Sequence, residues 1–218
     1  MLLRNLGGFL RDSMPDRARQ RYGDMEYDWE HRLNTSSGTV GWEARLLGIF
    51  HSPYQPTEPS LFREMMASLP IDFSAFMFVD VGSGKGRALL MASEYPFRKI
   101  LGIESIAELH RAAEDNIRVW QSSAQASTQR CRQIEAVLAD AREFEFPEEP
   151  QVLYFFNPLS ERAFSEMIER LTNSLARAPR PLWIVYHNPL LERVLRRSAA
   201  FVRVDGTEQV AVYCSNSS

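Results

Sequence analysis

Two patterns of apolar residues alternate along most of this 218-residue chain. Short continuous runs rich in Val, Ile, Leu and Phe are typical of strands buried on both faces of a parallel sheet. Between these runs, apolar residues recur at every third or fourth position, which is typical of helices that cover such a sheet. The runs predict strands at residues 78–81, 99–104, 133–138, 151–156 and 181–187.

The segments around these strands predict helices. One helix begins near Pro59, a residue suited to the first helical turn, and ends before Pro70. A second begins at Arg87, after the five residues that follow the first strand. The apolar faces that support the first and two later helices are Leu61, Met65 and Leu69, then Leu109, Ala113, Ile117 and Trp120, and then Phe164, Met167, Ile168, Leu171 and Leu175.

The two ends of the chain have different patterns. Residues 201–204 and 209–213 alternate apolar with other side chains, and Asp205-Gly206 between them is a hairpin signal. A parallel series of strands and helices would therefore close with an antiparallel hairpin. Residues 1–57 are polar and irregular, and we expect them to form a cap on a core of residues 58–218.

The first strand leads into a glycine-rich turn, Asp80-Val-Gly-Ser-Gly-Lys-Gly86. Glycines permit positive φ angles and let a ligand lie against bare backbone, so the turn is typical of nucleotide binding. The spacing differs from the G-x-G-x-x-G of dinucleotide sites, because Arg87 occupies the position of the third glycine. A carboxylate at Asp80 suits a cofactor that carries an ammonium and a sulfonium, and would be awkward beside a pyrophosphate.

This D-x-G-x-G-x-G string is similar to the first motif of the class I S-adenosylmethionine (SAM) methyltransferases. The resemblance implies roles for polar residues at the ends of the following strands. Glu104 would accept hydrogen bonds from both ribose hydroxyls, and Asp140 would accept one from the adenine amino group. Asn157, which precedes Pro158, would face the transferable methyl group.

The segment Tyr54-Gln-Pro-Thr57 is similar to the Tyr-x-Pro-Thr segment of seven-strand protein lysine methyltransferases. The resemblance implies that Tyr54 packs beside the cofactor and that Thr57 bonds its methionine end; an ordinary loop bounded by prolines is the alternative. From Tyr54 to Tyr213 the chain looks like small bacterial class I methyltransferases of unassigned substrate, which implies the sheet order 3-2-1-4-5-7-6. It departs from many amine methylators at Leu159, where they carry a second proline and then an aromatic residue.

Composition limits the other classes of function. Hydrophobic residues make up 44% of the chain, enough for a sizeable core, and the net charge of −3 gives no strong sign of nucleic-acid binding. We interpret the cluster of Arg193, Arg196 and Arg197 as a solvated helix face. Cys131 and Cys214 are expected to be free thiols, and no histidine spacing predicts a metal site. No apolar segment reaches the ~18 residues of a membrane span, and no secretory signal is recognised, so we expect a cytoplasmic protein without membrane association.

The sequence therefore predicts a Rossmann-like α/β fold, with a doubly wound seven-stranded sheet, and SAM-dependent methyltransferase activity. The acceptor is unidentified, with a protein lysine or another amine expected ahead of a small molecule. The alternatives are a SAM-binding scaffold without catalysis and, less favoured, an NAD(P)-linked oxidoreductase. His187 is either a general base or a hydrogen-bonded histidine at a strand end. Asn157 and Tyr54 are the predicted catalytic residues, and the predicted cofactor-binding set is Tyr54, Thr57, Asp80, Gly82, Ser83, Gly84, Gly86, Glu104, Asp140, Ala141 and Asn157.

Overall fold

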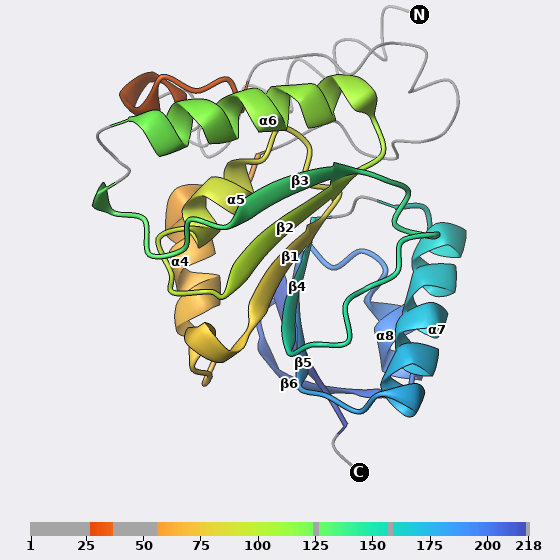
Figure 1. Ribbon diagram of the computed structural model, residues 1–218. Helices are drawn as coiled ribbons and strands as arrows, with labels where there is room; N and C mark the ends of the chain where they lie inside the picture. The colour runs from red at the N-terminus through yellow and green to blue at the C-terminus, as the bar shows by residue number, and fades with distance from the viewer. Residues whose placement is uncertain (1–26, 37–55, 124–126, 157–158, 217–218) are drawn as a thin grey trace, which may run out of the picture.

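Seven strands form one sheet through the centre of the protein (Figure 1). This computed structural model describes residues 27–36, 56–123, 127–156 and 159–216. The strand order is β3-β2-β1-β4-β5-β7-β6, as predicted, and β7 is antiparallel to both of its neighbours. The strands are β1 (Met77–Val81), β2 (Lys99–Glu104), β3 (Ile134–Leu138), β4 (Gln151–Phe155), β5 (Leu182–His187), β6 (Phe201–Gly206) and β7 (Val210–Ser215).

Helices cover both faces of this sheet, as Figure 1 shows. Because side chains alternate along a strand, each face has its own core. Phe78 and Tyr154 pack into the core under the first group of helices, whereas Val79 and Phe155 belong to the core under the second. The first group is α4 (Pro59–Ala67), α5 (Arg87–Ala92) and α6 (Ala107–Ser122), and the second is α7 (Glu161–Arg177) and α8 (Glu192–Arg197).

The central position of β1 and β4 explains their continuous apolar runs. Every residue of both strands is buried, because helices cover the sheet on each side. The chain winds outward in opposite directions from this pair, so the carboxyl ends of β1 and β4 form the topological switch point of the sheet. In open α/β sheets, ligands bind at this place.

Local signals fix where the helices begin. The Glu58 carboxylate accepts hydrogen bonds from the backbone N–H groups of Ser60, at 3.0 Å, and Leu61, at 2.9 Å, and so caps α4. Pro59 is the first residue of that helix, as predicted. In α7, the Ser160 hydroxyl accepts a hydrogen bond from the Ala163 N–H at 3.4 Å.

Two details of the sequence prediction need correction. Met65 and Leu69 of the predicted face near α4 are buried, whereas Leu61 is only partly buried. Phe62 and Met66 complete the buried face, because α4 packs by its Phe62 side against the aromatic side chains of β1 and β4. The hairpin turn follows Gly206 and does not lie at Asp205-Gly206, which belongs to β6. A register shift between Arg203 and Asp205 absorbs an extra residue before the turn.

Two further observations concern the organisation of the chain. Within the described residues, no helix combines the length and the apolar character needed to cross a bilayer. Residues 27–36 lie against α5 and α6, with the His31 ring 5.0 Å from that of Trp120. The division into a cap of residues 1–57 and a core of residues 58–218 stays a prediction.

Candidate cofactor site

The glycine turn after β1 has the backbone conformation that its sequence predicts. Gly82, Gly84 and Gly86 have φ angles of +76°, +55° and +84°, which side chains other than glycine rarely allow. The N–H groups of Gly82 and Ser83 donate to the Ile103 carbonyl of β2 at 2.8 and 3.0 Å. The turn is therefore tied to the neighbouring strand and holds its bare backbone at the carboxyl edge of the sheet.

A glycine in β2 makes this close approach possible. A Cβ atom at Gly102 would lie 2.8 Å from the Ser83 hydroxyl and 2.6 Å from a Leu89 methyl group. The Ser83 side chain is buried against this strand, and its hydroxyl has no hydrogen-bond partner in the described part of the chain. Ser83, a predicted cofactor residue, thus packs within the turn through its side chain, and its backbone carbonyl accepts a hydrogen bond from the Gly86 N–H at 2.8 Å.

Two acidic side chains lie at the base of the turn. Asp80 is 4% exposed, and burial, reinforced by the nearby Glu104, raises the pKa of its carboxyl to about 8. Burial also raises the pKa of Glu104, although hydrogen bonds from backbone N–H groups act in the opposite direction. The Glu104 carboxylate accepts one such bond from Gly84 and one from Ile106, each at 2.8 Å. Glu104 therefore fixes the backbone of the turn at Gly84.

In the described part of the chain, no lysine or arginine compensates this pair of acids. Among the described residues, no Lys or Arg forms an ion pair with Asp80 or Glu104, and no hydrogen-bond donor reaches the Asp80 carboxyl. Buried carboxylates are normally paired or hydrogen-bonded, because removing a charge from water is costly. Glu104 meets this need through its two backbone donors, whereas Asp80 has no such donor among the described residues and is suited to a ligand that brings its own positive charge.

A chain of three hydrogen-bonded side chains lies beside Asp80. Tyr154 lies beside Asp80 in the register of β1 and β4. Its hydroxyl is 2.6 Å from the Thr57 hydroxyl and 3.1 Å from Nδ1 of His187. Thr57 is thereby held against Tyr154 of β4, although the residue precedes the first strand by some distance in the sequence.

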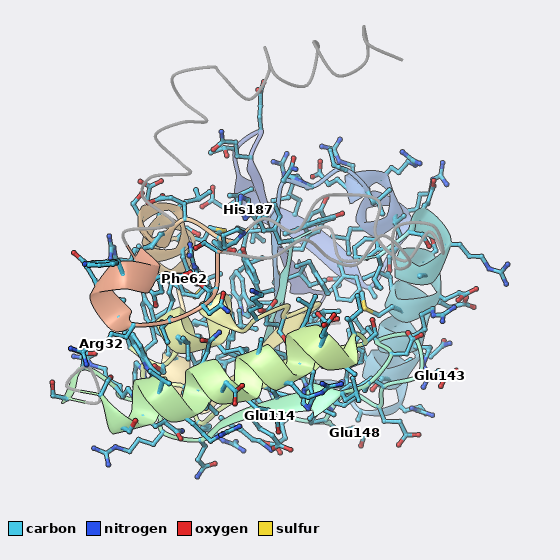
Figure 2. The ribbon with its side chains drawn as sticks, turned by 90° about the horizontal axis from the view of Figure 1, so that it is seen from above. Arg32, Phe62, Glu114, Glu143, Glu148 and His187 are labelled. Atoms are coloured by element: carbon cyan, nitrogen blue, oxygen red, sulfur yellow. The ribbon has the colours of Figure 1, made fainter. Side chains whose placement is uncertain are left out.

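His187 closes this chain at the end of β5. Burial lowers the pKa of its imidazole to about 4, so the ring is neutral near pH 7. The ring stacks on Phe156, with centroids 3.8 Å apart. Figure 2 shows His187 on the side of the sheet that also carries Phe62 of α4. The sequence left open whether His187 is a general base or a hydrogen-bonded histidine at a strand end. The contact with the Tyr154 hydroxyl agrees with the second interpretation.

The third predicted acid, Asp140, lies at the rim of the same edge. It follows β3, and the preceding Ala139 N–H donates to the Glu104 carbonyl at 3.0 Å, which places the two strand ends side by side. The Asp140 carboxylate accepts two hydrogen bonds of 3.0 Å from Nε of Arg142. This contact with Arg142 lowers the pKa of Asp140. Ala141 turns its side chain into the core under α7.

The structure thus brings together Asp80, the three glycines and Glu104, with Asp140 nearby, and connects Thr57 to this group through Tyr154. Tyr54 and Asn157 lie outside the described residues, so their predicted contacts with a cofactor and an acceptor stay predictions. The sequence analysis missed Tyr154, because its hydroxyl is hidden within an apolar run. The feature that could have pointed to Tyr154 is its polar hydroxyl near the end of that run, at the position that pairs with Asp80 of β1. No group of three or more His, Cys, Asp or Glu residues that could hold a metal occurs in the described part of the chain.

Comparison with known proteins identifies the fold. No protein-family model matches the sequence, and no curated protein matches it. An RNA methyltransferase from Salinibacter ruber in complex with S-adenosyl-L-homocysteine (SAH) is 20% identical, with a TM-score of 0.50 over 74% of this chain and 92% of that one. Magnesium protoporphyrin IX methyltransferase from Synechocystis PCC 6803 with bound SAM is 10% identical, with a TM-score of 0.52 over 91% and 95% of the two chains.

A third similar structure is a predicted N6-adenine-specific DNA methylase from Listeria monocytogenes. It is 12% identical, with a TM-score of 0.51 over 73% of this chain and 51% of that one. At such identities these likenesses show the fold, a Rossmann-like seven-stranded sheet of the kind found in these methyltransferases.

Proposed function

We propose that this protein is a SAM-dependent methyltransferase. The observation that carries the proposal is the buried pair Asp80 and Glu104, which lies under a glycine turn with positive φ angles and has no cation paired with it among the described residues. A dinucleotide would place pyrophosphate charge against these acids, whereas SAM carries an ammonium and a sulfonium. The fold shared with proteins crystallised with SAM and SAH supports the same cofactor.

Each part of the site would take one part of the cofactor. Asp80 would meet the positively charged methionine end, and the three glycines would let that end lie against the backbone. The Glu104 oxygens each accept one backbone hydrogen bond, and their remaining lone pairs could accept the ribose hydroxyls. Asp140 would reach the adenine amino group from the rim. When bound, SAM supplies a methyl group already activated by the sulfonium.

The protein would then promote methyl transfer mainly by positioning the acceptor and by excluding water from the site. An acceptor must lie in line with the bond from sulfur to the methyl carbon, at the edge formed by the ends of β4 and β5. We propose that the acceptor is an amine, with a protein lysine first, and that Tyr54 and Asn157 orient it after it has lost its proton. The three similar structures are named for action on RNA, DNA and a porphyrin, so the acceptor class must come from experiment.

Calorimetry tests the proposal most directly. We expect the purified protein to bind SAM and SAH, and the Asp80→Ala variant to bind neither at matched concentration. NADH should leave the melting temperature unchanged. Binding of NADH in place of SAM would overturn the proposal in favour of an oxidoreductase.

Transfer is tested separately from binding. Methyl-labelled SAM is incubated with protein and cell lysate, and label is counted in the protein, RNA and small-molecule fractions. Label in the protein fraction that requires Asp80 is the expected result. Binding of SAM without label in any fraction would identify a SAM-binding scaffold without catalysis.

A further inference from the structure

A short segment outside the sheet is attached to the glycine turn. Residues 27–36, which we call the clasp, comprise one helical turn at 27–31 and the residues that follow it. Figure 1 shows this segment beside α6, and Figure 2 shows Arg32 at its outer end. The clasp is separated from the turn by about fifty positions in the sequence, so its contacts with the turn are tertiary.

Asp28 organises the clasp internally. Its carboxylate accepts hydrogen bonds from the backbone N–H groups of Thr35, at 2.8 Å, and Ser36, at 2.6 Å. It also accepts bonds from both hydroxyls, and the one from Ser36 measures 2.5 Å. Burial alone would raise the pKa of Asp28, but these bonds outweigh it and the pKa falls below its usual value. The carboxylate is therefore charged and closes the segment into a compact loop.

Arg87 joins the clasp to the first residue of α5. Its side chain is only 2% exposed, and Nη2 donates to the Asp28 carboxylate at 3.2 Å. Nε donates to the Thr35 hydroxyl at 2.6 Å, and that hydroxyl donates in turn to Asp28. The guanidinium carbon also lies 4.9 Å from the centre of the Tyr27 ring. A buried guanidinium of this kind is stable only with such partners.

A second attachment lies on the other side of Gly86. Nζ of Lys85 donates to Oδ1 of Asn34 at 3.0 Å. The Asn116 side chain of α6 also connects the clasp to the glycine turn. Its amide nitrogen donates to the Lys85 carbonyl at 2.9 Å, and its amide oxygen accepts from the Asn34 N–H at 3.0 Å. Both neighbours of Gly86, whose φ is +84°, are thus bonded to the clasp.

We propose that the clasp holds the glycine turn in its cofactor-binding conformation, with Asp28, Thr35 and Arg87 as positioning residues. The inference rests on the proposed function, since it names what prepares the same site for SAM. A turn with three glycines has many accessible conformations, and fixing one of them before binding reduces the entropy lost when the ligand arrives. The clasp supplies that restraint from outside, at the residues on each side of Gly86.

Linkage makes the inference testable without any substitution. If the clasp favours the binding conformation, then cofactor binding must stabilise the docked clasp by the same factor. We therefore expect SAH to slow amide hydrogen exchange in residues 27–36 of the wild-type protein, as well as in residues 82–87. Protection of the turn without protection of the clasp would overturn the inference.

Substitutions at Thr35 provide the matched comparison. Thr35→Val removes the hydroxyl that links Arg87 to Asp28, and we expect it to weaken SAH binding by about tenfold, a usual size for the coupling between two sites. Thr35→Ser keeps the hydroxyl and should bind SAH like the wild type. Calorimetry is run well below the melting temperature of every variant, so that binding reports on the folded protein.

A control lies on the exposed face of α6. Asp115→Asn breaks an ion pair with Arg118 that does not touch the turn, and it should leave SAH affinity unchanged. Equal affinities for Thr35→Val, Thr35→Ser and the wild type would overturn the inference and leave the proposed function standing. Failure of the wild type to bind SAM or SAH would instead remove the proposed function, and the inference with it.

Discussion

Two of the buried acidic residues near the glycine turn, Asp28 and Asp80, are in opposite states. Asp28 receives backbone, hydroxyl and guanidinium donors, so its charge is stabilised inside the protein. Asp80 is also buried, but no donor or cation among the described residues reaches it, and its pKa rises to about 8. The comparison separates a buried acid that holds the fold together from one that is suited to a ligand.

The largest expected effect is on cofactor affinity at Asp80. Asp80→Asn keeps the shape of the side chain and removes its charge, so we expect SAM affinity to fall by about a hundredfold or more, as when a buried charge pair is lost. The ligand-free variant should at the same time be more stable than the wild type near pH 8. Calorimetry and thermal melting on the same samples measure both quantities.

The sign of the stability effect follows from linkage. The pKa of Asp80 is about 8 in the folded protein and near 3.8 as a reference, so the folded state binds more protons between these values and loses stability as the pH rises. Each pKa unit corresponds to about 1.4 kcal/mol, which makes the gain for Asp80→Asn a few kcal/mol near pH 8. A lower melting temperature for this variant would show that Asp80 is structural.

The same substitution at Asp28 should have the opposite sign. Asp28→Asn leaves the buried Arg87 without its counter-ion, and we expect a loss of about 3 kcal/mol in the free energy of unfolding. Chemical denaturation of the two Asn variants in parallel gives the comparison directly. Stabilisation by both substitutions would end the distinction drawn between the two acids.

A smaller effect is expected from pH alone. A cationic cofactor selects the ionised form of Asp80, so binding below pH 8 must be accompanied by release of a proton. SAM affinity should rise by up to about tenfold per pH unit as the pH increases towards 8, and then level off. Glu104 and Tyr154 also interact with Asp80, but a carboxyl group and a phenol are neutral or negative at any pH, so neither supplies the positive charge that the cofactor would bring.

Calorimetry in two buffers with different ionisation enthalpies counts the protons released. We expect the wild type to release close to one proton for each SAM bound near pH 7. The Asp80→Asn variant should release none, at concentrations where it still binds SAM. Affinity that is constant between pH 6.5 and 8.5 would contradict the assignment of the raised pKa to Asp80.

Much of this arrangement could be predicted from the sequence. The apolar runs gave the strands of the parallel core nearly residue by residue, because burial on both faces leaves a continuous signal. The glycine spacing and the acids at the strand ends gave the edge of the sheet where Asp80 and Glu104 meet. In parallel sheets, strand ends share one edge, so order along the chain translates into proximity.

The contacts that were not predicted depend on tertiary packing. Asp28 and Arg87 are far apart in the sequence, and each reads as an ordinary surface charge until both are found buried. Phe62 was missed in the α4 face because Leu61 and Phe62 are both apolar, and only the aromatic neighbours in β1 and β4 decide which one is fully buried. The hairpin turn was misplaced because a bulge in β6 leaves no separate sequence signal.

The smallest expected effect concerns Tyr154, which is the neighbour of Asp80 without being its counter-ion. Tyr154→Phe keeps the buried ring and removes the hydroxyl that joins Thr57 to His187. We expect a loss of about 1 kcal/mol in the free energy of unfolding, since one buried network is broken while the packing is retained. SAM affinity should fall only a few-fold, through the looser position of Thr57.

Phe156→Leu is the matched control for this last prediction, because it removes the ring that stacks on His187 and leaves the hydroxyl chain in place. If the hydroxyl chain positions Thr57 for the cofactor, Tyr154→Phe should weaken SAM binding and Phe156→Leu should not, even where their melting temperatures fall equally. Equal losses of affinity would mean that both changes act through general loosening of the sheet edge. In that case the contrast between Asp28 and Asp80 stands, but the hydroxyl chain does not position Thr57 for the cofactor.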